Sequence, residues 1–295
     1  MKKIETFENL LYYVKKENKK IWEIAQELHS FEFDIPIIKI REQTKKYLSS
    51  MKSAVDNGLK SDELSQSGMV GRDCAKLKEY YKGNKTLLSE VQKNVLLYAL
   101  ATAEENSRMG KISACPTAGS CGIVPSVILS YSLELKLNED DEINALLTAG
   151  LIGKIISNKI AIAGAVMGCQ GECGVASAMA SGALVQMMKG DAEKVLNAVS
   201  LALKNILGLT CDPVSGLVEV PCVKRNAFLA VNAIVGAELA LSGIKSVIPT
   251  DEVLDAMRQT GIMMSPNLKE SSQGGLATTK TALEITKKLE EKWLN

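Results

Sequence analysis

The chain has 295 residues, long enough for one large domain or two small ones, and 46% of them are hydrophobic. Its 35 Lys and Arg residues nearly balance its 34 Asp and Glu residues. The resulting net charge of +1 argues against a dedicated nucleic-acid binder or an electrostatic membrane anchor. Only 4% of residues are aromatic, and His29 is the single histidine. The composition therefore predicts an aliphatic core and excludes zinc sites built on several histidines and most Ser-His-Asp chemistry.

Nothing at the N-terminus has the apolar stretch of a signal peptide. The longest uncharged run, residues 112–133, contains Pro116, Pro125 and two glycines, so we expect a loop leading into a helix rather than a membrane span. The seven cysteines are an odd number and follow no secretion signal, which favours metal or redox chemistry over a disulfide scaffold. We expect a soluble protein of the cytoplasm.

The first hundred residues are the more polar part of the chain. They carry 32 charged side chains, and their apolar residues recur at helical spacing. This pattern predicts amphipathic helices near residues 4–29, 34–58 and 85–108. The stretch 59–84 contains Gly68, Gly71 and Gly83 and is expected to form loops.

Residues 143–250 carry only 14 charged side chains and are rich in Ala, Gly, Met and Ser. Their uncharged runs favour helices that are buried on most sides. A short strand is expected at 216–223. We therefore predict an all-α fold and one domain over 1–295, with a more polar helical part (1–100) and an apolar catalytic core (101–290).

Charges in this apolar half cluster around the cysteines. Five of the 14 lie within three residues of a cysteine: Glu172, Asp212, Glu219, Lys224 and Arg225. Because a buried charge is costly unless it is paired or serves a ligand, polar chemistry is expected where the thiols are.

Cys169, Cys211 and Cys222 lie in segments punctuated by glycine or proline, which are typical of turns. Three such cysteines could hold three irons of a [4Fe–4S] cluster and leave the fourth iron open to a substrate. Their separations of 42 and 11 residues match neither ferredoxin runs nor a zinc ribbon. The spacing alone leaves an iron–sulfur cluster, a zinc site and inert buried thiols as alternatives.

Four strings in the chain resemble the α subunit of the iron–sulfur-dependent L-serine dehydratases. They are PTAGS at 116–120, GCQ at 168–170, LTCDPVSGLVEVPCVKRNA at 209–227 and SQGGLA at 272–277. The similarity covers nearly the whole chain. It implies a helical catalytic domain and a [4Fe–4S] cluster bound by Cys169, Cys211 and Cys222. Cys115, Cys121 and Cys173 have no ligand counterpart, so they are either structural or alternative ligands; Cys74 is interpreted as structural.

The resemblance implies a lyase that converts L-serine to pyruvate and ammonia, with the open iron as Lewis acid, and an oxygen-sensitive enzyme. The family has single-chain and two-chain forms. This chain lacks room for the second domain of the single-chain form, so it resembles the isolated α subunit and should need a separate β subunit. No nucleic acid or membrane partner is expected.

Several residues of these motifs are candidates for catalysis or substrate binding. Lys224 is the candidate general base, or else it pairs with Glu219 or the substrate carboxylate. Arg225 is suited to binding the substrate carboxylate, or else to a salt bridge that holds the turn. Asn226 would donate to the substrate or cap the following helix. The hydroxyls of Thr117 and Ser120 would bind substrate or shape their loop.

Other motif residues are weaker candidates. Gly274 and Gly275 could present N–H groups to an anion. Glu104 and Glu105 are expected at a solvated helix end.

Other functions remain open at this point. The same elimination could act on L-cysteine or L-threonine. A pyridoxal-phosphate lyase would need a Schiff-base lysine and normally an α/β fold, which the helical pattern disfavours. A non-catalytic zinc- or thiol-containing helical protein is the alternative outside enzymes.

Overall fold

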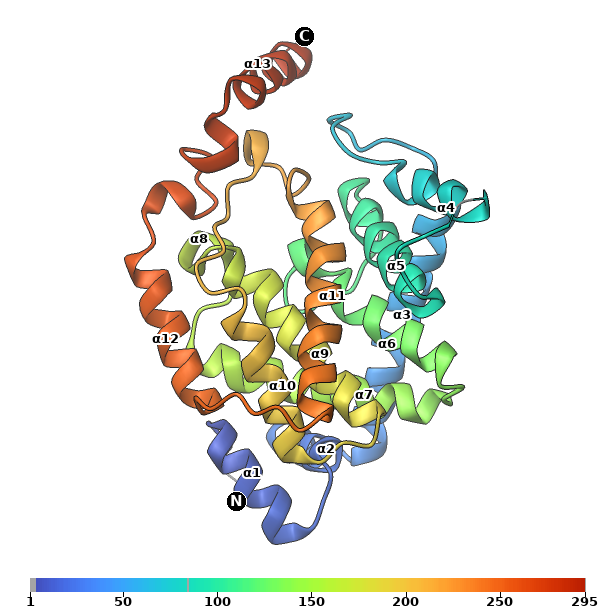
Figure 1. The fold of residues 1–295 in the computed structure, drawn as a ribbon, viewed down its shortest axis with the longest axis vertical. Helices are drawn as coiled ribbons and strands as arrows, with labels where there is room; N and C mark the ends of the chain where they lie inside the picture. The colour runs from blue at the N-terminus through green and yellow to red at the C-terminus, as the bar shows by residue number, and fades with distance from the viewer. Residues whose placement is uncertain (1–3, 84, 295) are drawn as a thin grey trace.

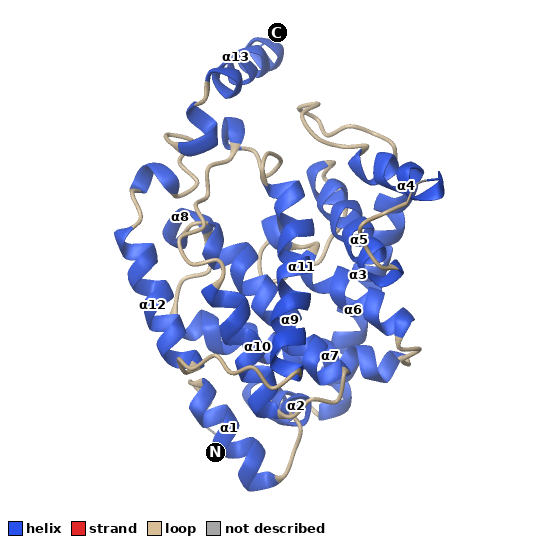
Figure 2. Cartoon of the chain, in the orientation of Figure 1, coloured by secondary structure: helices blue, strands red, loops and turns tan. Residues whose placement is uncertain are grey.

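The computed structural model describes residues 4–83 and 85–294 as helices and loops (Figures 1 and 2). The helices are α1 (Phe7–Glu17), α2 (Ile21–Phe33), α3 (Ile37–Lys60), α4 (Asp73–Gly83), α5 (Glu90–Ser107), α6 (Ile123–Glu134), α7 (Glu139–Lys159), α8 (Gly164–Met167), α9 (Val175–Met187), α10 (Ala192–Lys204), α11 (Cys222–Leu241), α12 (Thr250–Met263) and α13 (Lys280–Leu294). Short turns of other helix types are η1 (Ala118–Ser120), η2 (Gln170–Gly174, a π-helical turn), η3 (Val214–Gly216), η4 (Pro266–Leu268) and η5 (Gly275–Thr278). Extended pairing in the described part is limited to two isolated bridges, Leu64 with Gly71 and Cys211 with Lys269. The predicted all-α fold is confirmed.

α9 lies at the centre of the helical packing, where it contacts α6, α7, α10 and α11 (Figure 1). Nearly every residue of α9 is buried. A Cβ on Gly182 would lie 2.4 Å from Cδ1 of Ile152, so glycine here lets the Ile152 side chain of α7 pack directly against α9. The core is thus packed with small and aliphatic side chains in place of aromatic ones, as the composition predicts.

Three local predictions were wrong. The expected helix over 4–29 is divided into α1 and α2, because Asn18 takes a left-handed backbone conformation (φ 52°) and ends α1. The expected loop over 59–84 contains α4. The expected strand over 216–223 does not form, because Leu217 and Glu219 donate their N–H groups to nearby carbonyls of the same turn. The division of the domain at residue 100 stays a prediction.

No helix in residues 4–83 and 85–294 combines the length and apolar character needed to cross a membrane.

The contact between α3 and α5 depends on Gly58. A Cβ at this position would lie 2.1 Å from the backbone carbonyl oxygen of Ala101, which cannot rotate away. We expect Gly58→Ala to lower the free energy of unfolding by about 1–3 kcal/mol. Gly150→Ala on α7 is the matched control, since its Cβ would meet nothing within 4 Å, and helix propensity should make it neutral or stabilising. Urea denaturation followed by circular dichroism measures both, and equal effects would contradict this packing.

Candidate active site

Three turns bring Cys169, Cys211 and Cys222 together in the interior. Cys169 precedes η2, Cys211 lies in the loop after α10, and Cys222 is the first residue of α11. All three are buried and free. Burial, and then the nearby thiol of Cys169, raise the pKa of Cys211, with a smaller contribution from Cys222, so the three cysteines share one buried neighbourhood.

Gln170 joins the first two of these turns. Its backbone N–H donates to the carbonyl of Leu209 (3.1 Å), and its side-chain oxygen accepts from the N–H of Gly208 (3.0 Å). Its side-chain nitrogen donates to the carbonyl of Met257 on α12 (3.2 Å). Because Gln170 is fully buried, these bonds fix Cys169 against the loop that carries Cys211.

Arg225 and Asp212 hold the loop of Cys211 against the first turn of α11. Arg225 donates from Nη1 to the carbonyl of Thr210 (2.8 Å) and from Nη2 to Oδ1 of Asp212 (3.0 Å). Oδ2 of Asp212 accepts from the N–H of Leu276 in the glycine motif (2.8 Å). Gly275 has φ +60°, and a Cβ there would lie 2.5 Å from Oδ2 of Asp212, so the motif requires glycine. Of the two roles foreseen for Arg225, the structure contains the salt bridge that holds the turn.

Asn226 holds a different loop to the same turn of α11. Its Oδ1 accepts from the N–H of Gly122 (2.9 Å), while its Nδ2 donates to the carbonyls of Gly119 (2.9 Å) and Cys222 (3.0 Å). This buried side chain therefore contacts backbone on three sides. It fixes the loop with the PTAGS motif above the start of α11.

Within that loop, Thr117 and Ser120 differ in exposure. Ser120 is fully buried, and its Oγ donates to the carbonyl of Cys115 (3.3 Å) and contacts Oγ1 of Thr117 (3.1 Å). Thr117 is half-buried, and its hydroxyl lies beside the carboxyl of Glu172. Ser120 thus shapes the loop, whereas the hydroxyl of Thr117 points toward Glu172, which lies beside Cys211.

Glu172 and Cys173 lie in the site as well, although Glu172 was no candidate for catalysis and Cys173 was expected to be structural or an alternative ligand. Oε2 of Glu172 lies 3.9 Å from Sγ of Cys211, and burial raises the pKa of this carboxyl. Cys173 stands one turn after Cys169 and donates to the carbonyl of Gly119 (3.8 Å). The spacing from Cys169 could have indicated that both thiols share one side of a helix.

The electrostatic surroundings differ among the thiols. Burial raises the pKa of Cys222 to about 12, and burial also raises the pKa of Cys211. The Cys173 thiol beside Cys169, and then the Arg225 guanidinium, lower the pKa of Cys169. A bound metal would displace the protons that remain on these thiols.

Lys224 lies at the edge of the site. Its Nζ is 2.6 Å from Oδ2 of Asp73 at the start of α4, and its side chain is about half exposed (48%). The expected pairing with Glu219 does not form, because Glu219 accepts hydrogen bonds from Ser65 and Ser67 instead. These contacts join residues 65–73, in the more polar first hundred residues, to Glu219 and Lys224 on either side of Cys222.

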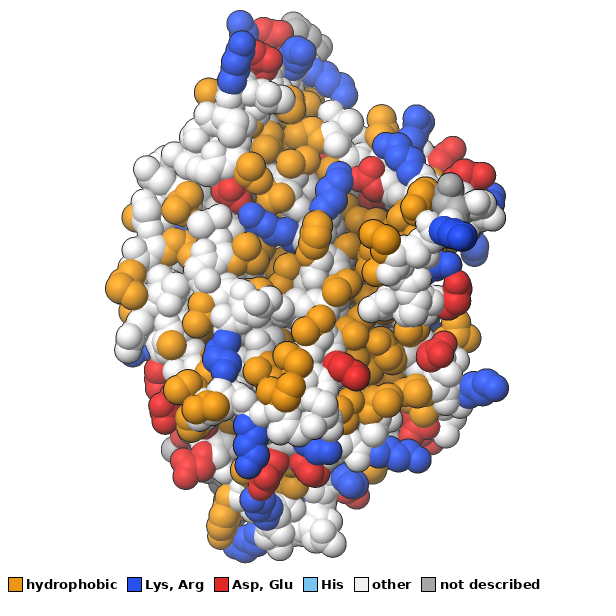
Figure 3. Space-filling model, viewed as in Figure 1, with side chains coloured by type: hydrophobic (Ala, Val, Ile, Leu, Met, Phe, Trp, Pro, Cys, Tyr) orange, Lys and Arg blue, Asp and Glu red, His pale blue; other side chains and the backbone are white. Residues whose placement is uncertain are grey.

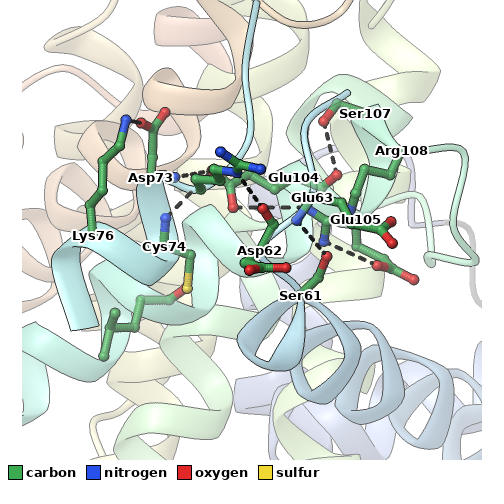
Figure 4. A network of polar contacts seen from close by, with 12 residues as sticks. Ser61, Asp62, Glu63, Asp73, Cys74, Lys76, Glu104, Glu105, Ser107 and Arg108 are labelled. Atoms are coloured by element: carbon green, nitrogen blue, oxygen red, sulfur yellow. Dashed lines mark hydrogen bonds and ion pairs between the residues drawn. The ribbon is translucent and has the colours of Figure 1, made fainter. Parts of the chain in front are cut away.

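Glu104 anchors that segment (Figure 4). It was expected at a solvated helix end, which is wrong: it is fully buried and accepts hydrogen bonds from the N–H groups of Asp73 (2.7 Å) and Cys74 (3.4 Å). A carboxylate at a helix N-terminus satisfies otherwise unpaired donors. Glu104 therefore fixes α4 and, through Asp73, the place of Lys224.

Two of the other cysteines, Cys74 and Cys121, contact α5. Cys74 donates to the carbonyl of Leu97 (3.5 Å) and Cys121 to that of Thr102 (3.8 Å), both on α5. Burial raises the pKa of Cys115 and of Cys121 to about 12. These contacts suit a structural role.

The donors beside Arg225 are thiols, the ligand type that iron–sulfur clusters use. In the described residues, no group of three or more His, Cys, Asp or Glu side chains is arranged to hold a metal ion. A four-iron cluster binds each cysteine through a different iron, so its cysteine ligands lie farther apart than the ligands of a single metal ion. Three buried thiols beside the positive guanidinium of Arg225 suit such a cluster, since thiolate ligands bring negative charge into the interior.

Comparisons with known proteins show which family this chain resembles. The model of a family described as "Serine dehydratase alpha chain" matches residues 13–277. A Bacillus subtilis protein named "Probable L-serine dehydratase, alpha chain" is 43% identical over 282 residues, covering 92% of this chain and 94% of that protein. The "L-serine dehydratase, alpha chain" of Peptoniphilus asaccharolyticus is 38% identical over 247 residues, covering 84% and 85%. The "L-serine dehydratase" of Streptomyces coelicolor is 37% identical over 242 residues, 81% of this chain but only 53% of that longer protein.

The role of Glu104 can be tested through the pH dependence of stability. Because burial raises the pKa of the Glu104 carboxyl, the folded protein binds its proton more tightly than the unfolded chain, whose glutamate pKa is about 4.3. The contribution to the free energy of unfolding therefore falls as pH rises from that value through the folded pKa. Glu104→Gln should weaken this fall, as measured by urea denaturation across that pH range. Glu104→Ala should cost about 1–3 kcal/mol, since it leaves the N–H of Asp73 without an acceptor. Identical pH profiles for the wild type and Glu104→Gln would contradict the assignment.

Proposed function

This chain belongs to the serine dehydratase α-chain family, and from that premise we propose that it is a lyase that converts L-serine to pyruvate and ammonia. We further propose that Cys169, Cys211 and Cys222 hold a [4Fe–4S] cluster. The observation that carries the proposal is the meeting of these three buried thiols from three separate turns. The guanidinium of Arg225 beside them supports an anionic occupant.

When bound, the cluster would supply a Lewis-acidic iron that assists departure of the serine hydroxyl, since hydroxide alone is a poor leaving group. A protein base must remove the Cα proton. Loss of water then gives aminoacrylate, which tautomerises to an imine, and water hydrolyses the imine to pyruvate and ammonia. The chain must therefore orient serine, accept one proton and limit access of water.

We propose distinct roles for the surrounding side chains. Thr117 orients the substrate through its hydroxyl, while Ser120 and Asn226 hold the Thr117 loop. Arg225 uses N–H donors for Thr210, Asp212 and Cys169, and we propose that a donor left over binds the substrate carboxylate. Ser120 and Asn226 would thus hold the backbone that positions Thr117 for its contact with the substrate.

Lys224 and Glu172 are the two candidates for proton transfer. Lys224 keeps its proposed catalytic role, with Asp73 holding its ammonium group in place. Glu172 is the second candidate, because its carboxyl lies beside Cys211 and Thr117.

We also propose a separate β subunit and a cytoplasmic location. Two relatives that match this chain over most of their length are named alpha chains, and it spans about half of the longer relative from Streptomyces coelicolor. The remaining part of that longer protein would correspond to the β subunit. L-Threonine and L-cysteine remain alternative substrates, to be separated by their kcat/KM values.

The cluster proposal predicts the iron and sulfide content of cysteine variants. Anaerobically purified wild type should hold about four irons and four acid-labile sulfides per chain, and exposure to air should bleach its visible absorption. Cys169→Ser, Cys211→Ser and Cys222→Ser should each lose most of both. Cys121→Ser is the matched control, since that buried thiol contacts α5 instead, and it should retain them. Zinc without sulfide in the wild type would instead support a non-catalytic thiol protein.

Steady-state kinetics with L-serine test the role of Lys224. If Lys224 takes part in proton transfer, Lys224→Met should lower kcat by about 10²–10⁴-fold with little change in KM. Lys76→Met is the matched control, because Lys76 also contacts Asp73 (3.5 Å) but from the exposed side of α4. A raised KM with kcat preserved would show that Lys224 only binds substrate. A kcat loss confined to Glu172→Gln would assign proton transfer to Glu172.

A further inference from the structure

Gly119 in the PTAGS loop faces a small space that side chains of the candidate site enclose. A Cβ at this position would lie 3.4 Å from Cγ1 of Val218, 3.6 Å from Oε1 of Glu172 and 3.9 Å from Oγ1 of Thr117. These are ordinary van der Waals distances. The fold therefore leaves room for about one methyl group beside the backbone of Gly119.

The backbone of Gly119 is held firmly beside this space. Its carbonyl accepts hydrogen bonds from Nδ2 of Asn226 (2.9 Å) and from the thiol of Cys173 (3.8 Å), and both of these residues are buried. Loss of a buried hydrogen bond is costly, so the loop cannot readily move to enlarge the space. The position of Gly119 thus sets one limit of it.

Val218 supplies the apolar wall of this space. It lies between η3 and α11, four residues before Cys222, and it is half-buried. Figure 3 shows hydrophobic side chains gathered over α11 and its neighbours, so partial exposure alone does not distinguish Val218. Its distinction is the space that it faces, whose other two nearest side chains, Thr117 and Glu172, are polar.

The carboxyl of Glu172 connects this space to the thiols. Its Oε2 lies 3.9 Å from Sγ of Cys211, while its Oε1 borders the space beside Gly119. Gly164 lies at the Oε2 end of the same carboxyl, but a Cβ there would lie only 2.5 Å from Oε2 and 3.0 Å from Sγ of Cys211. Of these two glycines, only Gly119 therefore leaves room for a further small group next to Glu172.

We propose that Gly119 and Val218 determine which amino acid the site accepts, by limiting the size of the group on the β carbon of the substrate. This inference rests on the proposed lyase activity. The β carbon of L-serine carries hydrogen and the departing hydroxyl, whereas that of L-threonine also carries a methyl group. Because the space holds about one methyl group, the β carbon of L-serine fits into it and the additional carbon of L-threonine meets Val218. The site thus accepts L-serine and disfavours L-threonine.

Substitution of Val218 tests the proposal through the ratio of kcat/KM for L-threonine to kcat/KM for L-serine. Val218→Ala should raise this ratio about tenfold or more, since one methylene in an apolar pocket changes discrimination by about 10–200-fold. Val220→Ala is the matched control, because it makes the same change in the same loop but Val220 packs against the core. The control should leave the ratio unchanged. All proteins are assayed anaerobically as the full chain with the β subunit, and the iron and sulfide content of each is measured.

Gly119→Ala is a second test that does not depend on L-threonine. Its Cβ would meet no atom closer than 3.4 Å, and Gly119 has no positive φ, so the melting temperature and the iron content should match those of the wild type. The added methyl group fills the space, so kcat/KM for L-serine should fall about tenfold or more.

An unchanged ratio in Val218→Ala, or an equal rise in Val220→Ala, would overturn the proposal, as would full activity of Gly119→Ala on L-serine. A wild type that uses L-threonine as efficiently as L-serine would also overturn it, while the proposed lyase activity would stand. A wild type with a complete cluster that eliminates water from neither amino acid would instead contradict the proposed function, and this inference with it.

Discussion

The first turn of α11 holds the site together. Two consecutive side chains in this turn bind two different loops: Arg225 binds the loop of Cys211, and Asn226 binds the loop of Thr117. The same turn begins with Cys222. One helix start thereby positions one thiol directly and two other segments through buried hydrogen bonds. Since unpaired buried polar groups are costly, either loop would lose its place if its partner on α11 were replaced by an apolar residue.

The aliphatic, glycine-rich core makes this arrangement possible. Close packing of α9 against its neighbours brings the turns at their ends near one another, and Gly164 and Gly275 leave room beside Cys211 and Asp212. A Cβ on Gly164 would lie 3.0 Å from Sγ of Cys211. The absence of large side chains is therefore a requirement of the site as well as of the packing.

The features of the fold that depend on local sequence patterns could be predicted from the sequence. Helical periodicity and small residues predicted the fold class, and the motif that contains Cys211 and Cys222 indicated which thiols to consider. The start of α4 escaped prediction because its cap, Glu104, lies on another helix. The partner of Lys224 escaped it too, since Asp73 is distant in sequence and Glu219 is near. Tertiary contacts of this kind leave no periodic signal.

The start of α11 supports the site from the inward face of this helix. The central claim is that three cysteines hold a four-iron cluster with one iron left for substrate. Mössbauer spectroscopy of the ⁵⁷Fe-loaded protein, with its β subunit, tests this claim most directly. Addition of L-serine should shift about a quarter of the iron signal and leave the remainder unchanged. A four-iron spectrum that L-serine does not alter, or a spectrum without a cluster, would contradict it.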